Sequence, residues 1–235
     1  MAPWQWIVLE GEMFIIGDLE DVAFIHSTGD TDYRDENRVE ALGRELGLAH
    51  IITLHQVHGA NILMAEECVE GQKREGDGLI TTTSTLGMGI LTADCLPLLL
   101  FTHRVVALLH VGWRGLKEGI VGRSIKYIKL LDNGLEEINT MFGPMIRECC
   151  YRVGENMIGE LRGALPKEVV RKGIKRREGR PFFSLKDAVT YLLRKEGVKG
   201  KIYDLSLCTC CSGHFPSYRR DGETASRFIS LAWKK

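Results

Sequence analysis

The chain has 235 residues, a length that fits one large domain or two small ones. Apolar residues make up 44% of it and charged residues 26%, which is typical of a soluble globular protein. Its 31 basic and 31 acidic residues give a formal net charge of zero. The overall charge therefore points neither to nucleic acid nor to an anionic membrane as a partner.

The cysteines and the N-terminus bear on localisation. The cysteines number seven, which is odd, and most are crowded into two groups instead of being spread along a disulfide framework. The two groups are Cys149 and Cys150, and Cys208, Cys210 and Cys211. The N-terminal residues lack a basic segment and reach Glu10 early, unlike a signal peptide, and the longest apolar run, residues 88–101, is too short to span a bilayer. We expect a cytoplasmic protein with reduced thiols.

Strand and helix patterns alternate without a long linker, so we expect a single domain over residues 1–235. In chain order, the patterns predict strands at 4–16 with a turn at 10–12, a helix at 35–46, strands at 50–54, 62–65, 77–83, 88–101 and 104–111, helices at 116–131, 155–165 and 184–196, and strands at 201–207 and 227–233. Gly47 is expected to end the first helix, and Ser184 with Asp187 forms a capping box before the last. Strand 88–101 is apolar enough to be buried on both faces, and the basic segment 171–180 is expected to be a solvated loop.

His110 stands where a ligand site is expected. It ends the predicted strand 104–111, and the turn Gly112-Trp113-Arg114-Gly115 and a helix follow it. Open α/β sheets bind ligands at strand ends of this kind, and a helix N-terminus beside an arginine suits an anion. Alternatively, His110 only hydrogen-bonds a strand carbonyl next to a tight turn, and the local sequence leaves both interpretations open.

Cys95 follows Asp94 within the apolar run at 88–101. A buried cysteine is usually a small hydrophobic residue, so Cys95 alone is weak evidence for a site. Asp94 strengthens that evidence, because a buried carboxylate needs a cation, a metal or backbone donors as its partner. It can also orient a metal-bound imidazole.

The segment HQVHG at 55–59 contributes a third side chain. If 55–59 were a strand, His55 and His58 would face opposite sides, but His58 beside Gly59 can reach out from a turn. His58, Cys95 and His110 together suit a zinc ion whose fourth position is left for water or substrate. If these three side chains converge, the chain has the metal site of an enzyme.

The other cysteines give a weaker signal. Cys208 to Cys211 resembles half of a zinc knuckle, with Cys149 and Cys150 as a possible second half. Cys208 and Cys211 lack a partner Cys-x-x-Cys at ribbon spacing, so the sequence favours ordinary thiols over structural zinc here. No P-loop, GxGxxG after a strand or GxSxG elbow is present in the sequence, so kinases, nicotinamide enzymes and serine hydrolases have no support.

Seven segments, taken in order, resemble the laccase-domain family, also called YfiH-like or polyphenol-oxidase-like. They are ENRVEALGRELGL (36–48), HQVHG (55–59), DGLITT (77–82), TADCLPLLL (92–100), HVGWRG (110–115), GPMIRECCYRVGE (143–155) and SYRRDG (217–222). The resemblance implies an α+β fold, an α/β sandwich of two mixed β-sheets flanked by helices, which certain cysteine–histidine toxin deamidases share. Two segments depart from the family pattern, HSTGDTDYRDENR (26–38) and CTCCSGHFPSYRRDG (208–222), and both are expected to alter the mouth of the pocket.

The resemblance also implies a function. The family is regarded as zinc-dependent purine nucleoside enzymes, which phosphorolyse adenosine, inosine, guanosine and methylthioadenosine and deaminate adenosine. Its metal ligands correspond to His58, Cys95 and His110. A purine nucleoside and phosphate are then the implied partners, while the sequence leaves the oligomeric state open. Copper is the weaker cofactor, because multicopper sites use many closely paired histidines and the seven histidines here are scattered.

The remaining site residues follow from the same hypothesis. Arg219 and Arg220, ahead of Arg114, are expected to hold phosphate, because guanidinium groups match phosphate oxygens. Asp94 or Asp77 would position or protonate groups near the purine ring. Gln56 is assigned to the substrate pocket.

Two rival hypotheses remain open. In a metal-free cysteine hydrolase or amidase, Cys95 would be the nucleophile and His110 its base, as the toxin likeness suggests. In a non-enzymatic protein, the buried cysteine and histidines would be structural, and the protein would neither bind metal nor turn over nucleosides.

Overall fold

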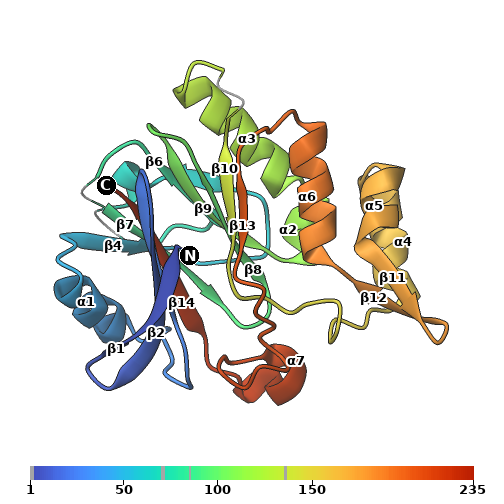
Figure 1. Cartoon of the computed structure of the whole chain (residues 1–235), viewed down its shortest axis with the longest axis horizontal. Helices are drawn as coiled ribbons and strands as arrows, with labels where there is room; N and C mark the ends of the chain where they lie inside the picture. Colours follow the sequence, from blue (N-terminus) through green and yellow to red (C-terminus); the bar gives the residue numbers. More distant parts are fainter. Residues whose placement is uncertain (1–2, 70–71, 85, 135–136) are drawn as a thin grey trace.

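The computed structural model describes residues 3–69, 72–84, 86–134 and 137–235, and two six-stranded sheets form its centre (Figure 1). The first sheet has the order β1 (Trp4–Leu9), β2 (Glu12–Leu19), β3 (Val22–Ser27), β14 (Phe228–Lys234), β7 (Leu86–Thr92) and β4 (His50–Thr53). The second has the order β13 (Ile202–Asp204), β10 (Asn139–Phe142), β8 (Leu96–Phe101), β9 (Val106–Val111), β6 (Gly78–Thr81) and β5 (Ile62–Met64). In each sheet parallel and antiparallel pairings occur together, so both sheets are mixed, as the resemblance implied.

The two sheets pack face to face over an apolar core. Ile15, Met88 and Ile90 of the first sheet meet Leu79 and Leu108 of the second there. Removing such side chains from water stabilises the fold by roughly 1.5–3 kcal/mol each. Every residue of β8 and β9 is buried, because helices cover the outer face of the second sheet.

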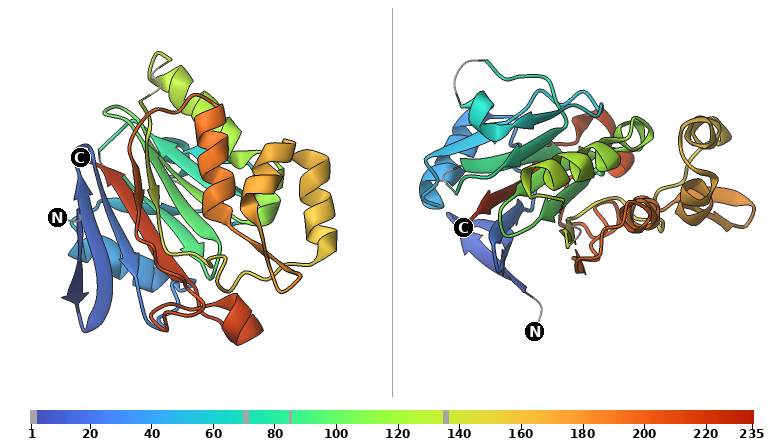
Figure 2. Two further views of the ribbon diagram at one scale, coloured as in Figure 1. Left: turned by 45° about the vertical axis from the view of Figure 1, so that its right-hand side comes forward. Right: turned by 90° about the horizontal axis from the view of Figure 1, so that it is seen from above.

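Helices cover the outer face of the second sheet, whereas a single helix of the described chain covers part of the outer face of the first (Figure 1). Helix α1 (Glu36–Glu45) packs on the first sheet through Val39 and Leu42. The second sheet is covered by α2 (Trp113–Lys117), α3 (Ile120–Leu131) and α6 (Leu185–Lys195), while α4 (Glu155–Ala164) packs on α2 and α5 (Lys167–Gly173) packs on α6. Beyond α6 lie α4, α5 and the hairpin of β11 (Ile174–Arg177) and β12 (Arg180–Phe183) (Figure 2). The described chain also contains α7 (Tyr218–Asp221) and the short 3-10 turns η1 (Ala65–Cys68) and η2 (Gly222–Thr224). Within the described ranges, each helix is too short or too polar to cross a membrane.

Two predicted helix boundaries are confirmed. Helix α1 starts after Asp35, whose side chain accepts a hydrogen bond from the Asn37 N–H at 3.0 Å, and Gly47 follows its end with φ of +67°. Helix α6 starts after Ser184, whose hydroxyl accepts from the Asp187 N–H at 3.2 Å. Such contacts satisfy N–H groups that have no partner inside the helix.

The single strand predicted at 88–101 is wrong, because the chain changes sheets in the middle of it. Strand β7 ends at Thr92 in the first sheet and β8 begins at Leu96 in the second. Between them Asp94 has φ of +92°, a left-handed backbone that turns the chain. Both halves are buried, so their apolar residues alone do not reveal the break.

Two further expectations are corrected. The helix predicted at 116–131 is two helices, α2 and α3, which are separated by Gly119 in a left-handed conformation with φ of +87°. The basic segment 171–180 is the end of α5 and the hairpin β11–β12. Glu178 and Gly179, with φ of +49° and +75°, supply the tight turn that this hairpin needs.

Candidate metal centre and active site

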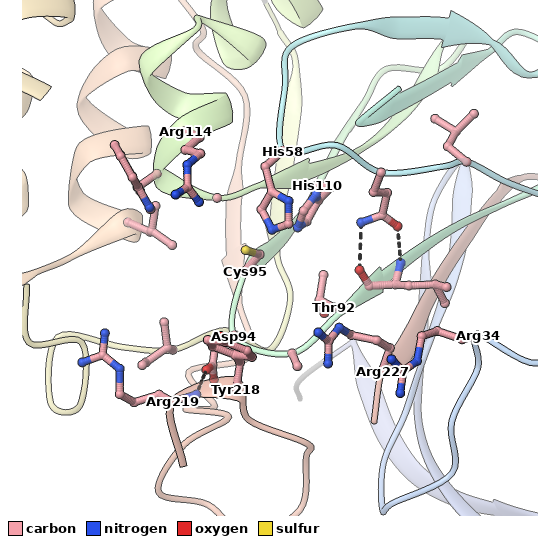
Figure 3. A pocket seen from close by; sticks show the side chains of 18 of the residues that line it. Arg34, His58, Thr92, Asp94, Cys95, His110, Arg114, Tyr218, Arg219 and Arg227 are labelled. Atoms are coloured by element: carbon pink, nitrogen blue, oxygen red, sulfur yellow. Dashed lines mark hydrogen bonds between the residues drawn. The ribbon is translucent and has the colours of Figure 1, made fainter. Parts of the chain in front are cut away.

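Strand register brings Cys95 and His110 together. In the antiparallel pair β8–β9, Pro97 faces His110, so Cys95 just before β8 lies beside the end of β9. His58 comes from the turn after β4 and has φ of +62°. The ligand atoms of His58, Cys95 and His110 all lie within 4.8 Å of one another (Figure 3). The structure thus brings together the three side chains that the sequence selected, and this set can bind a metal ion.

Asp77 holds two of these ligands in place. It precedes β6, which pairs with β9, and its carboxylate lies 2.7 Å from His110 Nδ1. The same carboxylate accepts the backbone N–H groups of Val57, His58 and Gly59 at 3.2, 2.9 and 2.7 Å. Burial alone would raise the pKa of Asp77, but the hydrogen bond from His110 and the backbone N–H groups lower it. From the sequence we expected Asp94 to orient an imidazole, but in the structure Asp77 is the carboxylate that orients His110. Because Nδ1 of His110 faces Asp77, its Nε2 is left to face His58 and Cys95.

Two glycines allow the close approach that the centre needs. A Cβ on Gly112 would lie 3.0 Å from Cys95 Sγ, and a Cβ on Gly115 would lie 2.7 Å from the Gly59 carbonyl oxygen. These glycines belong to the turn that the sequence marked after His110. Helix α2, which follows it, has only five residues, and the side chain of Arg114 within it lines the cavity.

Cys95 and His110 shift each other's pKa. Burial alone would raise the pKa of Cys95, but the charge of His110 and hydrogen bonds from His110 and His58 lower it to about 6. Burial alone would lower the pKa of His110, but the Cys95 charge and the Asp77 carboxylate raise it to about 9. When no metal is bound, both shifts favour a thiolate–imidazolium pair. The thiolate is the form that binds zinc, and it is also the form that acts as a nucleophile.

Asp94 ties the β7–β8 turn to the C-terminal part of the chain. Its carboxylate accepts hydrogen bonds from the Thr209 and Ser217 hydroxyls at 2.6 and 2.7 Å, and from the Arg219 backbone N–H at 2.7 Å. These donors satisfy the buried charge without a cation. We expected a buried Asp94 to need a cation, a metal or backbone donors, and the structure shows two hydroxyl groups and one backbone N–H in that role.

A cavity of about 740 Å³ opens over the three ligands. That volume is typical of sites for small molecules. Trp113, Tyr151 and Tyr218 are among its lining residues, and aromatic faces of this kind stack on bases. Thr92 also lines the cavity, and its buried hydroxyl has no hydrogen-bond partner among the described residues (Figure 3).

Four arginines line the cavity, on two sides of the ligands. Arg114 and Arg219 lie on one side and Arg34 and Arg227 on the other (Figure 3). One guanidinium nitrogen of Arg219 donates to the Arg152 carbonyl at 2.7 Å. Within the described chain, the Arg114 guanidinium makes no side-chain hydrogen bond and lies over the Trp113 ring, 4.8 Å from its centroid. Sequence reasoning missed Arg34 and Arg227, although Arg34 lies in the segment 26–38 that was expected to alter the mouth of the pocket.

Arg220 has a structural role that the sequence did not predict. It does not line the cavity. Its guanidinium pairs with Asp221 at 2.7 Å and donates to the carbonyl groups of Thr209, Cys210 and Phe215 at 3.2, 3.1 and 2.9 Å. With its donors occupied in this way, Arg220 stabilises the loop before α7.

Gln56 lines the cavity, but both ends of its amide are already used. Its nitrogen donates to the Leu91 carbonyl and its oxygen accepts the Leu91 N–H, each at 2.8 Å. This pair of bonds fastens the segment before His58 to β7. Gln56 therefore positions the turn that carries His58, and both ends of its amide are hydrogen-bonded within the protein.

A second cluster of thiols lies elsewhere on the chain. The Sγ atoms of Cys149, Cys150, Cys208 and Cys211 all lie within 4.8 Å of one another, so this cluster can also bind a metal ion. Cys149 and Cys150, which the sequence offered as a possible second half, supply the partners that Cys208 and Cys211 lack locally. An isolated parallel bridge between Met145 and Cys208 aligns the two segments, which spacing along the chain does not show.

Comparison with known proteins places the chain in a family. Residues 19–235 match the family described as multi-copper polyphenol oxidoreductase laccase. This chain belongs to the laccase-domain family. A relative from Aquifex aeolicus (strain VF5), named purine nucleoside phosphorylase, is 36% identical over 66% of this chain and 69% of its own. A second with that name, CA_C1699 from Clostridium acetobutylicum, is 33% identical over 77% of this chain and 76% of its own.

Solved structures of laccase-domain proteins share the fold. YlmD from Geobacillus stearothermophilus superposes with a TM-score of 0.87 over 100% of both chains, at 23% identity. The Neisseria meningitidis protein NMB0706 superposes with a TM-score of 0.81, also over 100% of both chains, at 24% identity. The sandwich of two mixed sheets expected from the resemblance is therefore confirmed.

Proposed function

We propose that this laccase-domain protein is a zinc-dependent purine nucleoside phosphorylase. The substrates we propose are adenosine, inosine, guanosine and methylthioadenosine, with deamination of adenosine as a second activity. The observation that carries the proposal is one cavity that combines a His58–Cys95–His110 set with arginines and aromatic side chains. Two relatives named purine nucleoside phosphorylase, at 36% and 33% identity, support the same activity.

The donor set of the site fits zinc. Two histidines and one cysteine are ligands of catalytic zinc, and a fourth position is then left for substrate or water. A blue-copper centre also uses two histidines and one cysteine, but it adds a weak axial methionine, and no methionine among the described residues lines the cavity. The two histidines in this set are also too few for a multicopper cluster. When bound, zinc would supply a Lewis acid at the open position.

The side chains of the cavity would bind the two substrates. We assign the phosphate dianion to Arg114 and Arg219, because guanidinium forks match phosphate oxygens. The purine would stack on Trp113 or a neighbouring tyrosine, and the free Thr92 hydroxyl would take a polar group of the nucleoside. Asp94, which lines the cavity, is the carboxylate near the substrate, whereas Asp77 does not line it and positions His110.

The reaction requires two substrates in a fixed orientation. In phosphorolysis, a phosphate oxygen bonds to the anomeric carbon as the bond from that carbon to the base nitrogen breaks, and the base leaves with the electron pair. Holding phosphate and nucleoside in one cavity makes this step effectively unimolecular. In deamination, water adds to the amino-bearing carbon of the purine and ammonia leaves. The second reaction needs no phosphate, so the arginines should matter only for the first.

We also propose that residues 1–235 act as one catalytic domain in the cytoplasm. Arg34 and Arg227, near opposite ends of the chain, line the same cavity, which supports a single unit. All seven cysteines are free thiols, and free thiols persist in reducing compartments.

A metal-free cysteine hydrolase or amidase is the second candidate function. The thiolate–imidazolium pair of Cys95 and His110, with Asp77 on the far nitrogen of His110, matches the arrangement of cysteine nucleophile, base and orienting acid. The two functions differ in their response to alkylation. Modification of Cys95 by iodoacetamide in zinc-containing protein, with the zinc retained, would favour the hydrolase, whereas protection of Cys95 by zinc favours the phosphorylase.

The direct test incubates the purified protein with adenosine, with and without phosphate, and separates the products by chromatography. The proposal expects adenine that forms only with phosphate, inosine that forms with or without it, and loss of both products in Cys95→Ser. Cys68→Ser, which changes a thiol in η1 outside the cavity, is the matched control and should keep both activities. If neither product forms with zinc-loaded protein, the proposed function is wrong.

A further inference from the structure

The four-thiol cluster has the spacing of a tetrahedral metal site. Its Sγ atoms all lie within 4.8 Å of one another, and those of Cys149 and Cys211 are 3.8 Å apart. Four sulfur atoms placed at a zinc–sulfur distance of about 2.3 Å form a tetrahedron with edges of about 3.8 Å. A disulfide would require about 2.05 Å between two of them. The cluster is thus spaced for a shared cation.

The backbone around the cluster is built to hold it. The segments 145–150 and 207–212 are joined by hydrogen bonds from the Thr209 N–H to the Met145 carbonyl at 3.0 Å and from the Met145 N–H to the Leu207 carbonyl at 3.4 Å. The Arg147 N–H points at Cys208 Sγ, 3.5 Å away, as a donor to a sulfur ligand does. These bonds place a neighbouring pair of cysteines on one segment opposite the Cys-x-x-Cys of the other.

The Arg147 guanidinium does not balance charge on the four sulfurs. It makes two hydrogen bonds to Asp204, at 2.8 and 3.1 Å.

Four thiol groups that share one site are soft ligands, and tetrahedral sulfur sets of this kind select zinc or iron–sulfur chemistry. The four cysteines fit a single ion, whereas a cluster needs room for bridging sulfides between the irons.

We propose that Cys149, Cys150, Cys208 and Cys211 bind a second zinc ion as a closed structural site, distinct from the one at His58, Cys95 and His110. All four positions of this ion are protein sulfur, so it has no vacant position for a substrate. This inference does not depend on the proposed phosphorylase activity.

The position of the second site gives it a role in the architecture of the cavity. Tyr151, which lines the cavity, directly follows Cys150. Thr209, whose hydroxyl holds Asp94, lies between Cys208 and Cys211, and the same segment leads to Arg219. A metal at the cluster would fasten both segments that carry these residues, in the way that a cross-link stabilises the loops that it closes.

The test is the zinc content of matched variants, measured by elemental mass spectrometry after dialysis. Wild-type protein should hold two zinc ions per chain, and Cys149→Ser and Cys211→Ser should each hold one. Cys210→Ser, in the same loop but outside the cluster, is the control and should hold two. Cys149 and Cys211 are exposed, so these variants are expected to fold, which circular dichroism checks.

A second readout separates the two sites. With cobalt in place of zinc, the four-thiolate site gives an intense sulfur-to-metal charge-transfer band, which should largely persist in His58→Ala and fall to the weaker band of the single Cys95 thiolate in Cys149→Ser. If zinc does not bind at His58, Cys95 and His110 but does bind at the four cysteines, the wild-type protein should hold one zinc ion and still show this band with cobalt. Wild-type zinc content and an unchanged cobalt spectrum in Cys149→Ser would overturn the second site, as would a disulfide between Cys149 and Cys211 found in the metal-treated protein.

Discussion

Replacing Asp77 by Asn should weaken metal binding strongly while leaving a folded protein. The buried carboxylate accepts the N–H groups of Val57, His58 and Gly59 and lies 2.7 Å from His110 Nδ1. Oδ1 serves His58 and His110, and Oδ2 serves the other two. An amide retains one of these oxygens and turns an NH₂ group toward the other pair of donors, whichever way it is rotated.

The size of the effect follows from the two hydrogen bonds that are lost. Each buried group left without its partner costs about 1–3 kcal/mol, so Asp77→Asn should lower the free energy of unfolding by roughly 2–6 kcal/mol. Loss of a carboxylate that orients a metal-bound histidine typically lowers metal affinity roughly 10- to 100-fold. The turnover measured at limiting zinc should fall with the affinity.

The assay compares zinc affinity, from competition with a chelating dye, with urea unfolding of the metal-free protein. Asp132→Asn is the control, because it also changes a buried acid but lies outside the cavity. Its zinc affinity should equal that of the wild type. If Asp77→Asn binds zinc as tightly as Asp132→Asn, Asp77 does not orient His110, and the account of the site is wrong.

Three further predictions concern packing, pH and phosphate. Gly115→Ala should destabilise the protein by about 1–3 kcal/mol relative to Gly122→Ala in urea unfolding, because its Cβ would lie 2.7 Å from the Gly59 carbonyl oxygen, whereas nothing lies within 4 Å of a Cβ at Gly122. Equal stability of the two alanine variants would show that α2 moves freely against the His58 turn. Burial lowers the pKa of His26 to about 3, so the unfolded chain takes up a proton first and stability falls as the pH drops below the unfolded pKa of 6.5. Relative to neutral pH, that loss should reach about 2 kcal/mol at pH 5. His26→Gln should lack this loss when urea unfolding is measured at pH 5 and at neutral pH. Arg114→Ala should raise the KM for phosphate by roughly 10-fold or more while adenosine deamination is unchanged, and an unchanged KM would remove this arginine from the phosphate site.

Local rules predicted much of the fold, but they missed the strands β3 and β10 and the change of sheet. The end of α1 before Gly47 and the cap of α6 at Ser184 depend on residues a few positions apart, so the sequence alone placed them. Strands β7 and β8 were predicted as one strand, because each is buried on both faces and neither apolar run shows which sheet it joins. The decisive feature, Asp94 with φ of +92°, is a backbone conformation that an aspartate does not reveal.

The three possible metal ligands could be selected from the sequence, because their residue types alone suggest metal binding. The hydrogen-bond partners of other candidate residues could not be predicted, because they come from distant parts of the chain. His58 was chosen as a donor in a turn, Cys95 as a thiol beside an acid in an apolar run and His110 as a donor at a strand end, and the register of β8 and β9 then brought two of them together. Arg220 was expected to bind phosphate, but its donors are occupied by carbonyl groups and Asp221. Distant partners of this kind, like those that join the two cysteine groups, depend on tertiary contacts that no spacing along the chain records.

The most direct test of the central claim is a crystal structure of zinc-loaded protein with anomalous data collected on both sides of the zinc absorption edge. The account predicts a zinc peak bonded to the imidazoles of His58 and His110 and the sulfur of Cys95, with a fourth neighbour that is water or a nucleoside group. A map without zinc at these three side chains, or with a fourth protein ligand that closes the site, would contradict it.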